Sequence, residues 1–289
     1  MSQDELIRLK KIVQDLETQV KTKSLEVMTY RQELQKFSQK LDSLMSQIAG
    51  DTQLLAQVQK VLVPTEMPRI PGFEFSRKFV FGSQSGGDYF DIFEHEDKFR
   101  FGVLVASSSG YAMSALFLSL ILKVSHILEA KKGNAPEKVL QQMADELKVL
   151  AGPKDYTNAF YAVIDRRDYS FKFCSAGQIE AFYMSHDRVV RHMKSEFSPF
   201  GQQFSAQLTS AQIELEPKSR VCIVTEGLLD IIGPDRVVKA MTNGVKAGVH
   251  ELRNELLFQA QQVSKLQEPL RDQTVVVIET KDQVIKLAK

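Results

Sequence analysis

The sequence predicts an α+β fold, a sandwich of strands and helices that follows a long coiled-coil helix. Two patterns lead to this expectation. The first fifty of the 289 residues carry a regular apolar heptad repeat. The rest of the chain places many short strand-like runs in meander order and its helices in pairs. A chain of this length suffices for one large domain or two modest ones.

Residues 1–50 repeat apolar side chains at a strict 3-4 spacing over about six heptads, which is typical of a coiled coil. β-Branched residues at one seam position and leucine at the other favour two parallel strands, so we expect a homodimer. A single amphipathic helix folded onto the domain is the alternative, although such helices usually show a broader apolar stripe. The expected dimer seam comprises Leu6, Leu9, Val13, Leu16, Val20, Val27, Tyr30, Leu34, Phe37, Leu41, Leu44 and Ile48.

The heptad phase resumes after a plausible kink at Gly50, and the helix must stop at Pro64 because proline cannot continue it. Residues 51–72 are therefore expected to form a linker helix and a proline-rich extended segment. Residues 73–281 would then form the globular domain, and residues 282–289 a C-terminal tail.

Within the globular part, alternating and aromatic-rich runs indicate strands, and longer apolar-periodic runs indicate helices. The expected strands are Phe73–Phe81, Tyr89–His95, Phe99–Ala106, Asn158–Asp165, Tyr169–Ala176, Ile179–Met184, Arg188–His192, Gln212–Leu215, Arg220–Thr225 and Thr274–Thr280. The expected helices are Tyr111–Lys131, Pro136–Leu150, Asp235–Thr242 and Val249–Lys265.

Composition excludes several classes of partner. Lys+Arg 37 nearly balances Asp+Glu 36, so no field favours nucleic acid or a membrane surface. Cys174 and Cys222 lie in apolar strand-like runs, where free buried thiols fit a reducing compartment. The N-terminus lacks the apolar core of a signal peptide, and the most apolar stretch, Ala112–Leu122, is too short to span a bilayer. We expect a cytoplasmic protein.

A strand, three serines, a glycine and a helix follow one another in Val103–Phe117, VLVASSSGYAMSALF. A hydrolase would use Ser107 or Ser109 as its nucleophile, but the segment lacks the G-x-S-x-G pattern and a nearby histidine. Small residues that allow a tight turn and cap the following helix are the favoured interpretation.

Several short motifs occur in the order found in SpoIIE-like PPM phosphatases, which include the RsbU-type regulators of bacterial stress signalling. The motifs are Gln59–Pro64, Gly86–Asp91 (GGDYFD), Ser107–Ala112, Ser175–Gly177, Ser198–Gly201, Thr225–Gly227 and Arg271–Thr274. The resemblance covers about residues 55–280. It implies a PPM-type α-β-β-α sandwich, in which two antiparallel sheets are flanked by helices. It also implies removal of phosphate from serine or threonine of partner proteins, with two Mn²⁺ or Mg²⁺ ions held by aspartates.

The residues at the implied metal site depart from the family pattern. Ser107 stands where the family has the aspartate that bridges the metals, and Arg271 stands at another metal-ligand position. Glu226 keeps a carboxylate on a longer arm. Hard dications need anionic oxygen ligands, and a guanidinium has no lone pair to donate. We therefore expect no catalytic residues and no bound metal at this degenerate site, which comprises Asp88, Ser107, Gly110, Glu226, Arg271 and Asp272.

The sequence therefore favours a catalytically impaired phosphatase-fold protein, a pseudophosphatase that acts as a dimeric signalling module by binding a protein partner. The alternative is an atypical metal-dependent serine/threonine phosphatase, which would retain weak activity and Mn²⁺ or Mg²⁺ through Asp88, Glu226 and Asp272.

Two further expectations concern Arg271. It could pair with Asp88, Glu226 or both in place of a metal. The second is phosphate binding without hydrolysis, through the amides of the serine turn and Arg271. The phosphate-binding candidates are Ser107, Ser108, Ser109 and Arg271.

Overall fold

The structure is a computed structural model, and it divides the chain into two compact units, Met1–Asp51 and Thr52–Lys289. It describes residues 68–82, 87–109, 133–244, 247–266 and 268–281, together with Leu16, Gln19, Val20 and Lys23. Those four residues of the first unit are helical and exposed. The rest of the expected coiled coil, the linker up to residue 67, Gly110, the helix Tyr111–Lys131 and the tail 282–289 lie outside the described residues.

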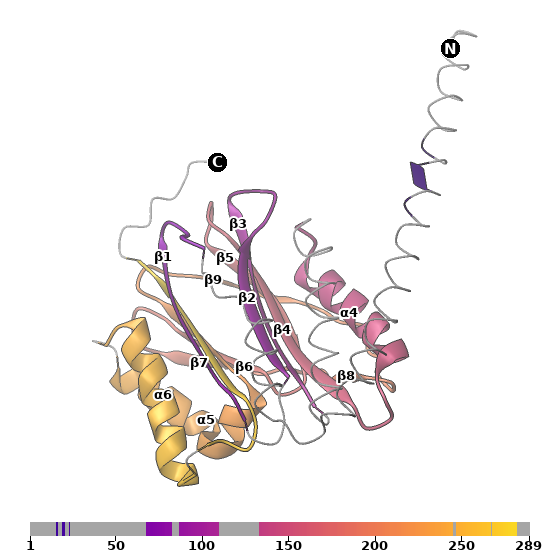
Figure 1. Ribbon diagram of the computed structural model, residues 1–289. Coiled ribbons are helices and arrows are strands. Elements are labelled where there is room, and N and C mark those ends of the chain that lie inside the picture. The colour runs from indigo at the N-terminus through magenta and orange to yellow at the C-terminus, as the bar shows by residue number, and fades with distance from the viewer. Residues whose placement is uncertain are drawn as a thin grey trace, which may run out of the picture. The chain divides into compact units, whose positions relative to one another are not determined.

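The described strands form two antiparallel sheets (Figure 1). The five-stranded sheet has the order β1 (Phe73–Val80), β11 (Gln273–Thr280), β10 (Arg220–Val224), β6 (Glu180–Met184) and β7 (Val190–Met193). The six-stranded sheet has the order β2 (Asp88–Glu94), β3 (Arg100–Ser108), β4 (Tyr156–Asp165), β5 (Ser170–Ala176) and β9 (Ala211–Glu214), with β8 (Phe200–Gly201) paired to β4.

Helices cover the outer faces of both sheets. The helix α4 (Pro136–Leu150) packs on β4 and β5, whereas α5 (Glu226–Asn243) and α6 (Val249–Ser264) pack on the five-stranded sheet. Together with the facing sheets, this confirms the expected α-β-β-α sandwich. Within the described part of the chain, no helix has the length and apolar character needed to cross a membrane.

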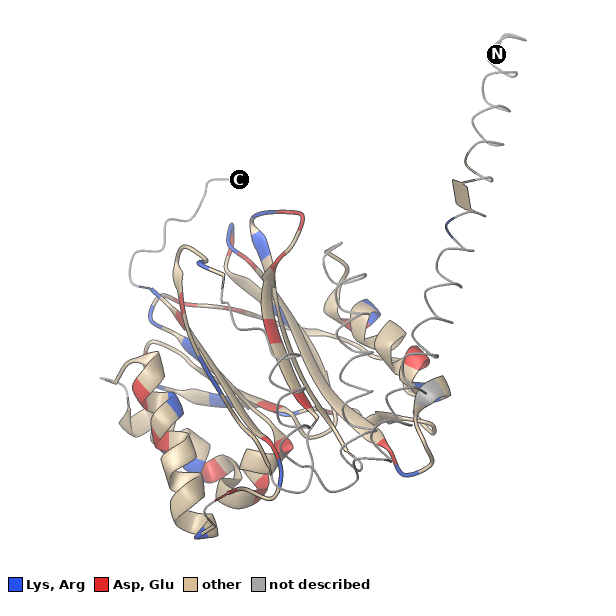
Figure 2. Ribbon diagram, in the orientation of Figure 1, with Lys and Arg blue, Asp and Glu red and all other residues tan. Residues whose placement is uncertain are grey.

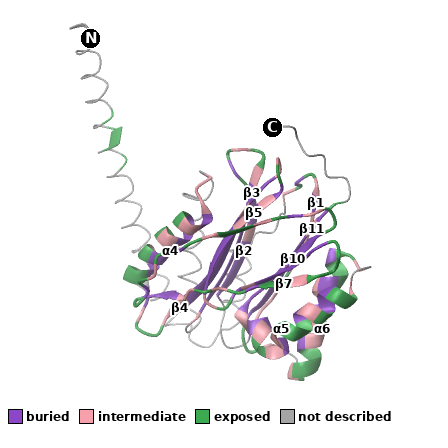
Figure 3. Ribbon diagram, turned by 180° about the vertical axis from the view of Figure 1, so that it is seen from behind, coloured by how far each residue is buried: buried purple, intermediate pink, exposed green. Residues whose placement is uncertain are grey.

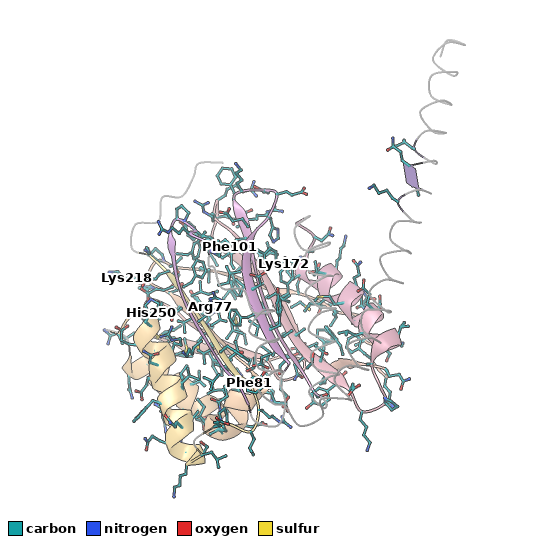
Figure 4. The ribbon with its side chains drawn as sticks, in the orientation of Figure 1. Arg77, Phe81, Phe101, Lys172, Lys218 and His250 are labelled. Atoms are coloured by element: carbon teal, nitrogen blue, oxygen red, sulfur yellow. The ribbon has the colours of Figure 1, made fainter. Side chains whose placement is uncertain are left out.

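Successive side chains of a strand point to opposite faces of its sheet, so each sheet packs into a different core on each side. On β3, Phe101, Val103 and Val105 point into the core between the sheets, while Leu104 packs into the cluster beneath α4. Phe101, labelled in Figure 4, meets the ring of Phe73 edge-on at a centroid distance of 4.9 Å. In Figure 3 the strands are mostly buried, and exposed positions gather on the outer helix faces.

The expected elements that fall on described residues agree with the structure to within two residues at each end, apart from two differences. The helix α5 begins at Glu226 rather than at Asp235. Gly233 adopts a non-helical φ of 69° and divides α5 into two helical segments ahead of Pro234, and only the second segment was expected. Pro234 then stands near the start of the second segment, where proline is tolerated. The strand β8 was missed because it has only two residues. The helix Pro136–Leu150 has the expected bounds.

Candidate functional site

An open pocket of about 220 Å³ lies where the family motifs meet. The register of β2 and β3 places Ser107 opposite Asp88. The start of α5 and the segment before β11 complete the walls. The lining residues are Gly87, Asp88, Ser107, Ser108, Ser109, Tyr156, Glu226, Gly227, Arg271 and Asp272. The structure thus brings together every expected metal-site and phosphate-site residue that it describes.

The carboxylate of Asp88 is buried among hydroxyl groups. Its Oδ2 accepts hydrogen bonds from Thr225 Oγ1 at 2.7 Å and from Thr274 Oγ1 at 2.8 Å. The hydroxyl of Ser107 is a further donor to Asp88. Burial, followed by the charge of Asp272, raises the pKa of Asp88 to about 7, although the three hydroxyls act in the opposite direction.

The carboxylate of Asp272 accepts hydrogen bonds from backbone amides. Its Oδ1 accepts the N–H of Gly82 at 2.8 Å, and its Oδ2 accepts those of Gly87 at 3.0 Å and Asp88 at 3.2 Å. Gly82 and Gly227 hold the main chain of residues 271–272 between them. A Cβ on Gly82 would lie 2.3 Å from the carbonyl carbon of Arg271, and one on Gly227 would lie 2.1 Å from the carbonyl oxygen of Asp272.

Glu226 is the partner of Arg271. Arg271 Nη1 lies 2.5 Å from Glu226 Oε1 and 3.2 Å from Asp230 Oδ2, one helical turn further along α5. Glu226 also accepts hydrogen bonds from Tyr156 Oη at 3.3 Å and Asn158 Nδ2 at 3.0 Å. Of the two partners considered for Arg271, Glu226 is therefore the one that the structure provides, while Asp88 accepts its hydrogen bonds from hydroxyls.

The serine turn is hydrogen-bonded to β4 and to the start of β2. Ser108 Oγ lies 3.0 Å from Thr157 Oγ1, and Ser109 Oγ accepts the N–H of Tyr156 at 2.8 Å. The amide of Ser108 donates to the carbonyl of Gly87, and the amide of Ser109 donates to that of Tyr156. These two N–H groups are therefore not free to bind a phosphate. The serine hydroxyls contact Asp88, Thr157 and Tyr156 rather than a histidine, which disfavours a nucleophilic role.

Sequence reasoning missed Tyr156 and Asn158, which both contact Glu226. Asn158 also accepts the N–H of Gln178 at 2.9 Å, and the turn at Gly177, with φ of 76°, leaves room for it. A Cβ on Gly177 would lie 2.0 Å from Asn158 Oδ1. The antiparallel pairing of β4 with β3, once known, would have placed both residues beside the serine turn.

The donor set does not fit two divalent cations. Such ions need several oxygen ligands, preferably anionic ones. Here the Asp88, Asp272 and Glu226 carboxylates accept hydrogen bonds from hydroxyls, backbone amides and side-chain donors that include the Arg271 guanidinium. Among the residues that the structure describes, no three His, Cys, Asp or Glu side chains are grouped so that they could hold a metal ion.

The model of the family Stage II sporulation protein E (SpoIIE) matches residues 97–281, which is more than half of the chain. The chain belongs to the SpoIIE family. This SpoIIE-family chain is also 23% identical, over 147 residues, to the phosphoserine phosphatase RsbU of Bacillus subtilis (strain 168). That match covers 51% of the chain and only 43% of RsbU.

Solved structures share the fold of this SpoIIE-family chain at low identity. The SiaA-PP2C domain of Pseudomonas aeruginosa has a TM-score of 0.68 at 15% identity, over 82% of this chain and 99% of that one. The PP2C phosphatase domain of SpoIIE from Bacillus subtilis, solved with a fragment of its regulatory domain, has a TM-score of 0.63 at 17% identity, over 74% of this chain and 64% of that one. RsbX in complex with magnesium has a TM-score of 0.59 at 15% identity, over 75% and 99%. These likenesses establish a PPM phosphatase fold.

Proposed function

We propose that this SpoIIE-family chain is a pseudophosphatase, a catalytically impaired phosphatase-fold protein that acts in signalling by binding a partner protein. The contact between Arg271 and Glu226 carries the proposal. It places a fixed cation on the carboxylate that would otherwise be the most accessible ligand for a metal, at 2.5 Å from its oxygen. Arg271 keeps its charge at any physiological pH.

Loss of the metal ions would abolish phosphate-ester hydrolysis rather than merely slow it. In a two-metal site the ions produce the attacking hydroxide and neutralise the phosphate. Neither the neutral hydroxyl of Ser107 nor Arg271 supplies the first of these roles. Without dications, Asp88, Asp272 and Glu226 leave the pocket acidic, which also disfavours retention of a phosphorylated side chain.

A dimeric binding role fits the N-terminal part of the chain. Leu16 and Val20, which belong to the expected seam, are helical and 53% and 64% exposed in the single chain, so a second copy has apolar surface to cover. Partner binding through protein surfaces also fits the charge distribution, because basic and acidic residues are interspersed over the described strands and helices (Figure 2). The buried free thiols of Cys174 and Cys222 fit a cytoplasmic setting.

Turnover of a phosphoserine peptide and of p-nitrophenyl phosphate, with Mn²⁺ or Mg²⁺ added, tests the proposal. We expect rates at the level of the protein-free blank and no change on adding EDTA, while RsbU from Bacillus subtilis serves as the active control. Metal-dependent turnover that Asp88→Asn abolishes would instead establish the alternative, an atypical phosphatase working through Asp88, Glu226 and Asp272.

A further inference from the structure

We infer that Asp88, Thr225 and Thr274 form a metal-free junction that links the two sheets at the pocket. The inference rests on the proposed function, because such a junction is needed where no bridging ion performs that task. Asp88 belongs to β2 of the six-stranded sheet, whereas Thr274 lies on β11 and Thr225 directly follows β10, both of the five-stranded sheet. The three side chains are hereafter called the Asp88 junction.

The direction of each hydrogen bond in the Asp88 junction follows from its neighbours. Thr225 Oγ1 accepts the backbone N–H of Thr274 at 2.9 Å, so its own proton points to Asp88 Oδ2, 2.7 Å away. The N–H of Thr225 donates to the carbonyl of Thr274. Both threonines are fully buried and Asp88 is 2% exposed, so water does not compete for these bonds.

Asp272 adds a second link between the same two sheets. It directly precedes β11, and its Oδ2 accepts the amides of Gly87 and Asp88 at the start of β2. The carboxylate of Asp88 therefore accepts hydrogen bonds from two threonines of the five-stranded sheet. The backbone amide of Asp88 donates to Asp272, which precedes a strand of that same sheet. A cation that approached these carboxylates would have to share their oxygens with the donors that already bind them.

The Asp88 junction has a functional consequence. Because internal donors satisfy its acids, the pocket keeps its shape without an ion, and so does any partner-binding surface around it. We therefore expect the fold to be indifferent to chelation. Removal of one hydroxyl from the junction should be harmful, since it leaves a buried carboxylate short of a donor.

Matched substitutions of the two threonines test the Asp88 junction. Thr225→Val and Thr274→Val remove the hydroxyl at nearly constant volume, whereas Thr225→Ser and Thr274→Ser keep it. Melting followed by circular dichroism in EDTA, at one protein concentration, should show each valine variant melting about 3–8 °C below the full-length parent. The serine variants should melt close to the parent, and Thr225→Val should lower the Tm less in an Asp88→Asn background.

Valine variants that melt like the parent would overturn the inference, as would a Thr225→Val effect that is unchanged in the Asp88→Asn background. The proposed function fails through different results, namely metal-dependent turnover or a rise in the parent's Tm on adding Mn²⁺. The EDTA melts therefore report on the Asp88 junction alone.

Discussion

Two substitutions in the pocket, Ser107→Asp together with Arg271→Asp, should create a metal site in this SpoIIE-family chain. The change supplies a carboxylate at each position where the family resemblance places one, and it removes the guanidinium from Glu226. Asp88 and Glu226 then have two further acids beside them, which is the anionic oxygen environment that a hard dication requires.

The electrostatic effect of Arg271 can be worked from its contact with Glu226. Nη1 lies 2.5 Å from Oε1. An Mg²⁺ ion about 2.1 Å from that oxygen would therefore lie within about 4.6 Å of Nη1. At an effective dielectric constant of about 20, their repulsion is about 7 kcal/mol. Because Arg271 is 48% exposed, solvent screens the charge. About half of the repulsion, about 3–4 kcal/mol, still corresponds to about 100- to 1000-fold in affinity.

Isothermal titration with Mn²⁺ measures the gain. The parent should show no saturable binding at micromolar metal, and the double variant should bind with a Kd at least about 100-fold below any parent value. The double variant should also melt lower than the parent in EDTA, because the carboxylate introduced at position 107 and that of Asp88 repel each other, and Mn²⁺ should restore its Tm by mass action. Ser107→Asn with Arg271→Lys is the control that retains both charge states.

The reasoning is refuted if the parent itself binds two Mn²⁺ ions at micromolar affinity. It is equally refuted if the folded double variant binds metal no better than the control with asparagine and lysine. In that second case, features other than the charges at these two positions would be what excludes metal.

Four further results are expected. Arg271→Ala should lower the Tm by about 1–3 °C, because Glu226 loses its cationic partner at a half-exposed site. An unchanged Tm would show that the ion pair contributes nothing to stability. Burial lowers the pKa of His95 to about 4 from 6.5. The contribution of His95 to the free energy of unfolding should therefore be fully present above pH 6.5 and be lost toward pH 4. Denaturant titrations should show a decrease of up to about 3 kcal/mol over this range. His95→Phe should remove that decrease. The raised pKa of Asp88 has the opposite effect, since it makes the free energy of unfolding fall as the pH rises from about 4 toward 7, and Asp88→Asn should remove this second pH dependence. Deletion of residues 1–50 should convert a dimer to a monomer in light scattering, and a dimer that survives the deletion would exclude the expected seam.

The sequence predicted the sandwich well because most of its strands have distinct inner and outer faces. Along β3 the neighbouring residues Val103 and Leu104 enter different cores, so this strand is buried on both sides and appears in the sequence as a continuous apolar run. The start of α5 was hidden because Gly233 and Pro234 indicate a break, although the chain is helical on both sides of it. Local pattern therefore indicated the second segment, from Asp235, and missed the helical segment that precedes Gly233.

The residues that line the candidate site could be predicted from the sequence, whereas their contacts could not. The ordered motifs indicated that Ser107 and Arg271 belong to one site, and both line the pocket. The choice of Glu226 over Asp88 as the partner of Arg271 depends on the three-dimensional path of α5. The hydroxyls of Thr225 and Thr274 around Asp88, like the contact of Asn158 with Glu226, arise only when distant strands are brought together.

Gly82 and Gly227 enclose residues 271–272, and they set the backbone path there independently of the side chain at position 271. The main chain there is positioned by backbone packing against Gly82 and Gly227, and that packing does not depend on the side chain that residue 271 carries. An acid could therefore give way to a guanidinium without moving the peptide that bears it. The side chain at position 271 can therefore differ between chains of this fold while the backbone path of the pocket wall stays the same.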